Sequence, residues 1–200
     1  FTLLKVDSDS PDICVLDNWK KVWIECNLST RGDREKSEDD IEPRKYATLE
    51  EPFEFQEVNV DANILRCTSL VSKKKEQHQK WISKDVCQED EQFIIALNGS
   101  ELDLRLHTQY IPDIARAVYP LGDMYVSFNP NDPDDTTGGY HHQTVITKTS
   151  GAEVNTEFFM KPDSSHISGI LYSCALCYEP VSSLPQHYFT YIPNFYADNP

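Results

Sequence analysis

The sequence has few basic residues for its size. Lysine and arginine number 18 against 33 acidic residues, which gives a net charge of -15. Beyond residue 100 the basic residues are only Arg105, Arg116, Lys148 and Lys161. Proteins that bind nucleic-acid backbones depend on Lys and Arg to neutralise phosphates. The composition therefore argues against general binding of nucleic acid, and leaves room only for a local contact assisted by a metal ion.

The sequence also lacks membrane and export signals. No run approaches the roughly 18 apolar residues of a membrane span, and the opening stretch from Phe1 to Lys5 lacks the pattern of a secretory signal peptide. Six cysteines in a chain of 200 residues are compatible with reduced thiols. We expect a cytoplasmic protein with no membrane partner, and the sequence indicates no oligomeric state.

What is present indicates one globular domain of the α/β or α+β class, and we expect α/β. Hydrophobic residues make up 39% of the chain, enough for a core. Periodicity predicts helices and strands interleaved around a mixed sheet. The predicted helices cover 61–83 and 108–118. The predicted strands cover 1–6, 13–16, 22–26, 92–97, 123–128, 143–149, 153–160, 166–176 and 187–193. A charged stretch at 31–57 is expected to be a surface insertion, and residues 129–142 a loop.

One carboxylate stands in an apolar strand. Glu25 lies within Val22-Trp23-Ile24-Glu25-Cys26, where a charge is costly unless it is paired or binds a metal. Asp12 begins the preceding strand of the same predicted hairpin. Two carboxylates and the backbone carbonyl of Cys26 would form an oxygen-rich site suited to Mg²⁺. The alternative is that Asp12 caps a turn after Pro11 and that Glu25 faces solvent.

A lysine falls on the apolar face of the long predicted helix. Lys74 follows Val71 by three residues and Leu70 by four, so it shares their face. A lysine directed toward a core needs an anionic partner. The alternative is that its stem packs there while its amine reaches solvent.

Four stretches resemble a group of uncharacterised bacterial proteins with the PD-(D/E)XK core of many restriction endonucleases. They read "SPDICVLDNWKKVWIEC", "RCTSLVSKKKEQHQKW" followed by "FIIAL", "EFFMKPDSSHISGILYS" and "FTYIPNFYADNP". The resemblance implies a mixed central sheet flanked by helices, in a restriction-endonuclease-like core. It also implies that Asp12 and Glu25 are metal ligands.

The chain departs from that family pattern at Asn27, where the motif has lysine. Asn can form hydrogen bonds but supplies no positive charge. Some members place the lysine on the following helix, and by this resemblance Lys74 takes its role. Arg66, two turns earlier, is a second cation that could approach the scissile phosphate. The predicted catalytic set is therefore Asp12, Glu25, Asn27, Arg66 and Lys74.

Two functions follow from these predictions. The first is a Mg²⁺- or Mn²⁺-dependent nuclease that hydrolyses phosphodiesters in DNA or RNA. The alternative is a nuclease-fold protein without activity that serves as a binding module. Asn27 and the charge of -15 favour the second function.

Two further motifs are weaker. A single pair of cysteines, Cys174 and Cys177, lacks the second pair or the histidines of a structural zinc site, so we expect unliganded thiols. His166 opens the "HISGILYS" stretch and is expected to be a structural histidine rather than a site residue.

Overall fold

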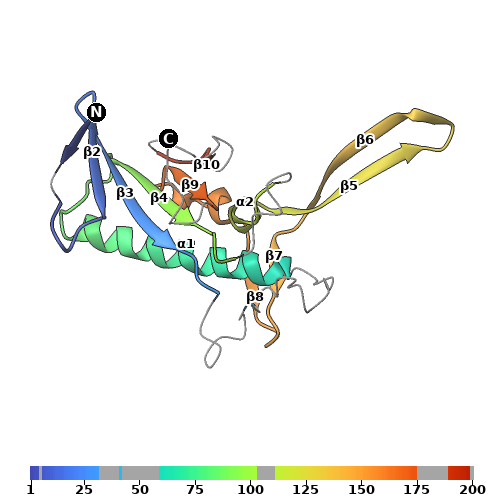
Figure 1. The fold of residues 1–200 in the computed structure, drawn as a ribbon, viewed down its shortest axis with the longest axis horizontal. Coiled ribbons are helices and arrows are strands. Elements are labelled where there is room, and N and C mark those ends of the chain that lie inside the picture. Colours follow the sequence, from blue (N-terminus) through green and yellow to red (C-terminus); the bar gives the residue numbers. More distant parts are fainter. Residues whose placement is uncertain (5, 32–40, 42–58, 103–110, 175–188, 199–200) are drawn as a thin grey trace, which may run out of the picture.

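The computed structural model describes residues 1–4, 6–31, 41, 59–102, 111–174 and 189–198. Its centre is a six-stranded mixed sheet in the order β1-β2-β3-β4-β9-β10, with a long helix against one face (Figure 1). This confirms the predicted α/β class and mixed sheet. The strands of the sheet are β1 (Thr2–Leu4), β2 (Ile13–Asp17), β3 (Lys20–Leu28), β4 (Gln92–Asn98), β9 (Gly169–Ser173) and β10 (Phe189–Pro193).

A tight turn joins β2 to β3. Asp17 pairs with Lys20, so only two residues form the loop. These are Asn18 and Trp19, both with positive φ, at 47° and 69°. Two consecutive positive φ values define a type I′ turn, whose twist matches that of the strands it joins. The turn fixes the register that places Ile13 opposite Ile24.

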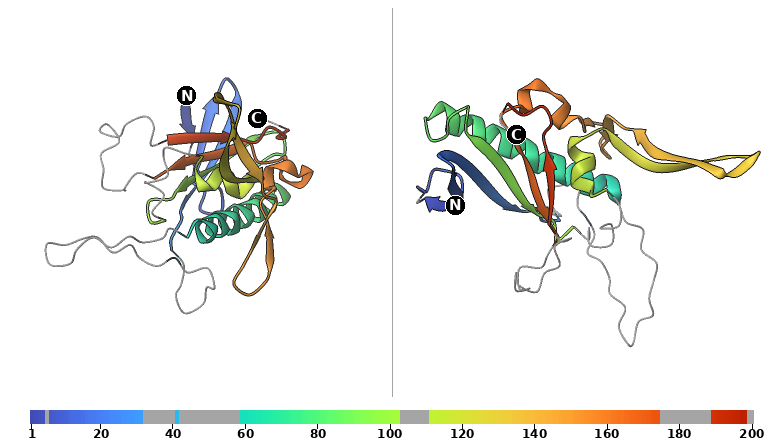
Figure 2. Two further views of the ribbon diagram at one scale, coloured as in Figure 1. Left: turned by 90° about the vertical axis from the view of Figure 1, so that its right-hand side faces the viewer. Right: turned by 90° about the horizontal axis from the view of Figure 1, so that it is seen from above.

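A crossover connects β3 to the parallel strand β4 through helix α1 (Val60–Ser83). The predicted helix is confirmed to within one residue at its start. Asn59 caps it, since its side chain accepts a hydrogen bond from the amide of Ala62. A second parallel pairing joins β4 to β9. Figure 2 shows α1 running along one face of the sheet.

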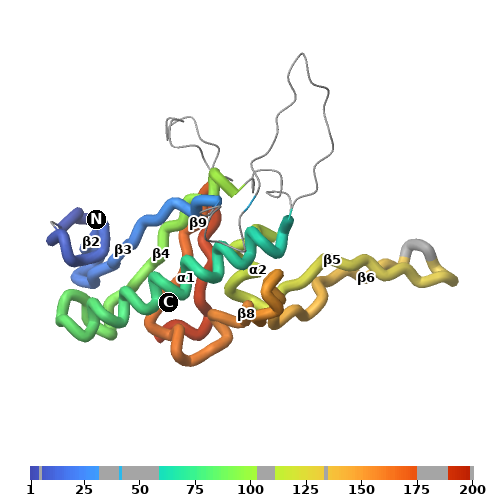
Figure 3. Tube along the Cα trace, turned by 90° about the horizontal axis from the view of Figure 1, so that it is seen from below, coloured from blue at the N-terminus to red at the C-terminus, as the bar shows by residue number. Residues whose placement is uncertain are grey.

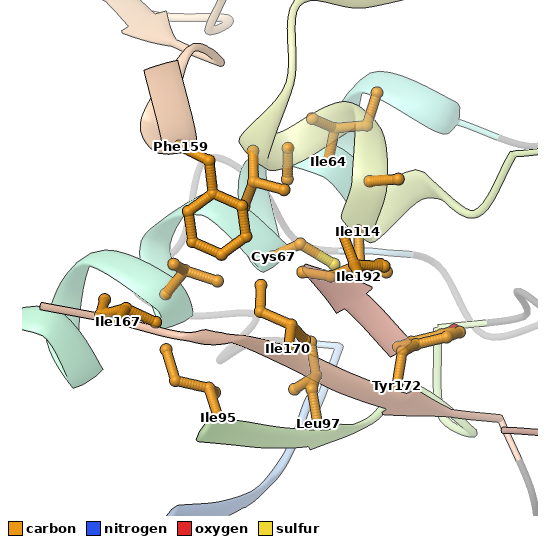
Figure 4. Packing of buried hydrophobic residues seen from close by; sticks show 14 of the residues in the cluster. Ile64, Cys67, Ile95, Leu97, Ile114, Phe159, Ile167, Ile170, Tyr172 and Ile192 are labelled. Atoms are coloured by element: carbon orange, nitrogen blue, oxygen red, sulfur yellow. The ribbon is translucent and has the colours of Figure 1, made fainter. Parts of the chain in front are cut away.

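The main core lies between α1 and the strands β4 and β9. Ile95, Leu97 and Ile170 point from the sheet toward Cys67 on α1 (Figure 4). Phe159 and Ile114 close the same core from the short helices η2 (Phe158–Met160) and α2 (Asp113–Val118). Alternate residues of β4 are fully buried, whereas their neighbours are half-buried. The core is therefore concentrated on the side of the sheet that α1 covers.

The structure corrects the predicted loop at 129–142. Most of it is strand β6 (Asp132–His142), which pairs with β5 (Leu121–Asn129) in an antiparallel hairpin. The hairpin projects from the body of the molecule (Figures 1 and 3). Proline and glycine predicted a loop, but a two-stranded ribbon tolerates both, because β6 is an edge strand. Gly139 even has a packing role, since the ring of Tyr125 lies close over it.

Other predicted boundaries need smaller corrections. Helix α2 begins at Asp113, after Pro112, rather than at 108. Strands β7 (Val145–Thr147) and β8 (Glu153–Asn155) form a separate short hairpin. The 3₁₀ helix η2 at Phe158–Met160 replaces the predicted end of the second strand, and a further 3₁₀ helix, η3 (Pro162–Ser164), follows it. Most of the acidic insertion at 31–57 lies outside the described residues.

Two histidines join α1 to the segment before β9. Their Nδ1 atoms, in His78 and His166, lie 2.8 Å apart. The ring of His78 also stacks on Phe93, with centroids 3.8 Å apart. Burial is the largest cause that lowers the pKa of both side chains, to about 3 for His78. Only one nitrogen of each ring takes part in this contact, because the Nε2 atoms of both histidines are buried without a hydrogen-bond partner among the described residues.

The histidine pair predicts a specific loss of stability in acid. Unfolded His78 takes up a proton near its ordinary pKa of about 6.5, whereas folded His78 does so only near about 3. Its contribution to the free energy of unfolding is therefore complete above pH 6.5 and decreases as the pH falls toward 3. Denaturant titrations between pH 7.5 and 5.5 should show this decrease, with a shallower slope for His78→Gln.

The matched control is the exposed His141, on the projecting hairpin. His141→Gln should keep the wild-type dependence of stability on pH. An equal change of slope in both variants would contradict a special role for the buried pair.

Candidate functional site

The hairpin of β2 and β3 brings the two predicted carboxylates together. Asp12 stands immediately before β2, and its carboxylate accepts a hydrogen bond from the amide of Cys26 at 2.8 Å. In return the Asp12 amide lies 3.3 Å from Oε2 of Glu25. These reciprocal contacts follow from the register set by the I′ turn, and they place both carboxylates at one end of the strand pair.

Glu25 faces the helix rather than solvent. Along β3 it shares a face with Trp23, and both are buried. Its direct neighbour on β4 is Ile95, a core residue. Only 5% of Glu25 is exposed. This excludes the alternative in which Glu25 is a solvent-facing strand residue.

Lys74 supplies the charge that Glu25 needs. Its Nζ lies 2.6 Å from Oε1 of Glu25, and the two side chains are 15% and 7% exposed. Burial is the largest effect on the Glu25 carboxyl and raises its pKa above the ordinary value. The hydrogen bond and charge of Lys74 oppose that shift. The amine of Lys74 therefore does not extend into solvent, which excludes the other alternative considered for this residue.

A second polar side chain on α1 holds Lys74. The amide oxygen of Gln77 accepts a hydrogen bond from Lys74 Nζ at 3.1 Å. The two residues are three positions apart, so they are neighbours on one helix face. Gln77 was missed in the sequence because a neutral residue on a partly polar helix carries no distinctive signal. Its spacing from Lys74 was the only available clue.

The two remaining predicted site residues, Asn27 and Arg66, lie at different distances from the carboxylates and Lys74. Asn27 is half-buried two residues beyond Glu25 on β3, and it therefore shares the face of Glu25. Arg66 donates instead to the backbone and hydroxyl oxygens of Thr30, after the end of β3. Eight residues of helix separate Arg66 from Lys74, or about 12 Å along the axis. Arg66 thus anchors the chain that leaves β3, and the structure does not bring it to the carboxylates.

The other chemical motifs give no site among the described residues. Cys174 is buried, and Cys177 lies outside the described part of the chain. In that part, no group of three or more His, Cys, Asp or Glu side chains is arranged to bind a metal ion. A metal site within these residues would therefore use fewer side chains, together with backbone oxygens and water.

The residues at Asp12 and Glu25 fit a divalent cation of that kind. The donors are two adjacent carboxylates and the backbone oxygen of Cys26, all of them hard oxygen ligands, and Mg²⁺ commonly binds through one or two carboxylates while keeping several waters. Two adjoining carboxylates next to a single lysine also leave negative charge in excess. A cation would balance that charge.

No family model, curated protein or solved structure matches the chain. Over the part of the chain that the structure describes, no helix is both long and apolar enough to cross a membrane.

We predict strong coupling between Glu25 and Lys74. Replacing Lys74 by Met leaves a carboxylate buried without its cation, and breaking a buried pair in this way typically costs about 3–5 kcal/mol. The double variant Glu25→Gln/Lys74→Met should recover part of that loss. Chemical denaturation of the wild type, both single variants and the double variant measures the coupling energy, which should exceed about 1 kcal/mol.

The control for this cycle is the ion pair between Lys21 and Glu91, in which the lysine side chain is 42% exposed. Its coupling should be smaller, because exposed pairs contribute little. If the coupling of Glu25 with Lys74 is no larger, the pair is not a dominant constraint on the fold.

Proposed function

We propose that the protein is a metal-dependent phosphodiester hydrolase with a restriction-endonuclease-like core. The observation that carries this proposal is the convergence of Asp12, Glu25 and Lys74, from the start of β2, from β3 and from α1, on one group of contacts. The order of elements supports it as well. An antiparallel hairpin bears both acids, and a crossover helix then leads to a parallel strand.

In this proposal Asp12, Glu25 and the Cys26 carbonyl hold Mg²⁺ or Mn²⁺. The ion, when bound, lowers the pKa of a coordinated water and stabilises charge on the phosphate. Lys74 orients the attacking water and offsets negative charge that develops beside the carboxylates. Its helix position replaces the lysine that Asn27 does not provide. Gln77 holds the Lys74 amine in place.

The alternative function is a binding module with this fold and without activity. The net charge of -15 favours it, because an acidic surface repels a polyanionic substrate. A buried Glu–Lys pair can also serve folding alone. The two functions are therefore distinguished by whether metal binding and cleavage require the same residues.

A cleavage assay tests the enzyme. Purified protein with Mg²⁺ or Mn²⁺ should cut single- or double-stranded DNA or RNA, and EDTA should abolish cleavage. Asp12→Asn, Glu25→Gln and Lys74→Met should each reduce the rate by more than the roughly 10- to 100-fold that loss of an outer-shell partner costs. Circular dichroism and a thermal melt establish that each variant is folded.

The matched control is Lys73→Met, which removes the same charge from an exposed position next to Lys74. It should keep the wild-type rate. No metal-dependent cleavage of any of these substrates, or equal losses for Lys73 and Lys74, would favour the binding module. Isothermal titration with Mn²⁺ separates the two proposals further. The hydrolase should lose affinity for Mn²⁺ in Asp12→Asn, whereas the binding module need not.

Gln77 should act as a positioning residue. Gln77→Leu removes one hydrogen bond to Lys74 without removing a charge, which corresponds to about a three- to tenfold effect. We expect kcat to fall by that factor while KM stays nearly constant, because Gln77 does not contact substrate. A fall in stability with an unchanged kcat would show a purely structural role instead.

A further inference from the structure

The projecting hairpin of β5 and β6, here called the arm, carries a row of exposed apolar side chains. Met124, Val126 and Phe128 alternate along β5 and therefore share one face. They are 52%, 52% and 66% exposed. Tyr140 pairs with Met124 across the ribbon, so it extends the row on that face. We call these four residues the arm stripe.

Apolar residues exposed singly are ordinary, but four side by side on one face indicate a contact surface. Val126 is left uncovered because its cross-strand neighbour is Gly138. Among the described residues, neither β5 nor β6 pairs with a third strand. An isolated two-stranded ribbon is marginally stable in water. Its free backbone edges can accept another extended chain.

The charge of the arm restricts its partner. From Leu121 to His142 the sequence contains four aspartates and neither lysine nor arginine, and Asp123 at the base of the arm pairs with Arg116 of α2. A nucleic acid or an anionic membrane would be repelled, since each is bound through basic residues. A second copy of the chain also carries a net charge of -15. Charge complementarity therefore favours a basic partner.

We infer that the arm binds an extended protein segment in which lysine or arginine alternates with apolar side chains. The apolar side chains of the segment would lie on the arm stripe, and its backbone would pair with a free edge of the ribbon, as in strand addition. Its cations would face Asp132 and Asp135 near the tip of the arm. This inference is independent of the proposed hydrolase.

A labelled synthetic peptide tests the inference directly. The probe is a 12-residue peptide that alternates Lys with Val, and fluorescence anisotropy follows its binding to the whole protein at physiological salt. A peptide with Glu in place of Lys should bind at least about tenfold more weakly. The variant Val126→Thr/Phe128→Thr should also lose about tenfold or more in affinity for the lysine peptide. Both positions are exposed, so folding should be kept.

Matched controls remove the same chemistry elsewhere. Phe1→Thr/Leu3→Thr deletes two side chains that are 98% and 72% exposed, and it should leave affinity within about twofold of wild type. For charge, Asp132→Asn/Asp135→Asn should weaken binding more than Asp7→Asn/Asp9→Asn, although both change the net charge by the same amount. Equal effects of arm and control variants would overturn the inference.

Three other results would also overturn it. Sedimentation velocity could reveal a dimer that Val126→Thr/Phe128→Thr dissociates, which would assign the stripe to a second copy of the chain. Anisotropy with a labelled oligonucleotide could show binding that the same variant abolishes, which would assign the stripe to nucleic acid. Equal affinity of the wild type for the Lys and Glu peptides would contradict the role of charge.

Discussion

The ion pair between Glu25 and Lys74 is the constraint around which the candidate site is arranged. A carboxylate that is only 5% exposed on the inner face of a sheet is unfavourable unless a cation lies next to it. Helix α1 provides that cation from the face that packs against the sheet, so the pair helps to fix the rotation and position of the helix over β3. The same pair leaves Asp12 beside Glu25 with an excess of negative charge. In the proposed hydrolase, structural and chemical roles would therefore coincide in these residues.

The arrangement of the other polar groups follows from this pair. Gln77 can reach Lys74 only because both lie on the face of α1 that meets the sheet. One turn after Lys74, His78 lies against Phe93 and His166, where burial keeps the His78 ring neutral. Trp23, on the same face of β3 as Glu25, donates to Glu91 just before β4. A line of polar contacts thus runs between helix and sheet within an apolar layer.

Much of the core could be predicted from local pattern. Helical periodicity placed Lys74 on the inner face of α1, and a carboxylate in an apolar strand identified Glu25. The hairpin between β2 and β3 was predictable, although the positive φ values of its turn residues Asn18 and Trp19 were not. The pairing of His78 with His166 spans 88 residues, and no local pattern reports contacts of that range.

The arm was the main failure of prediction, for a physical reason. Proline, glycine and aspartate indicate a turn only when nothing else stabilises an extended chain, and here cross-strand pairing with β5 overrides them. The prediction for Arg66 was too general, because spacing along a helix gives the face of a residue but not its distance from a partner. The backbone of Thr30 was the nearer acceptor.

The long connection between β3 and α1 bears on how variable this chain can be. Strand β3 ends at Leu28 and α1 begins at Val60, yet Glu25 and Lys74 meet across a separation of 49 residues. The entropy of closing such a loop grows only logarithmically, by about 0.6 kcal/mol for each doubling of its length. Insertions or deletions between β3 and α1 would consequently change the free energy of bringing Glu25 and Lys74 together very little. Such changes should leave the pair in place as long as Ile41, which lies in this connection and belongs to the hydrophobic core, keeps its position.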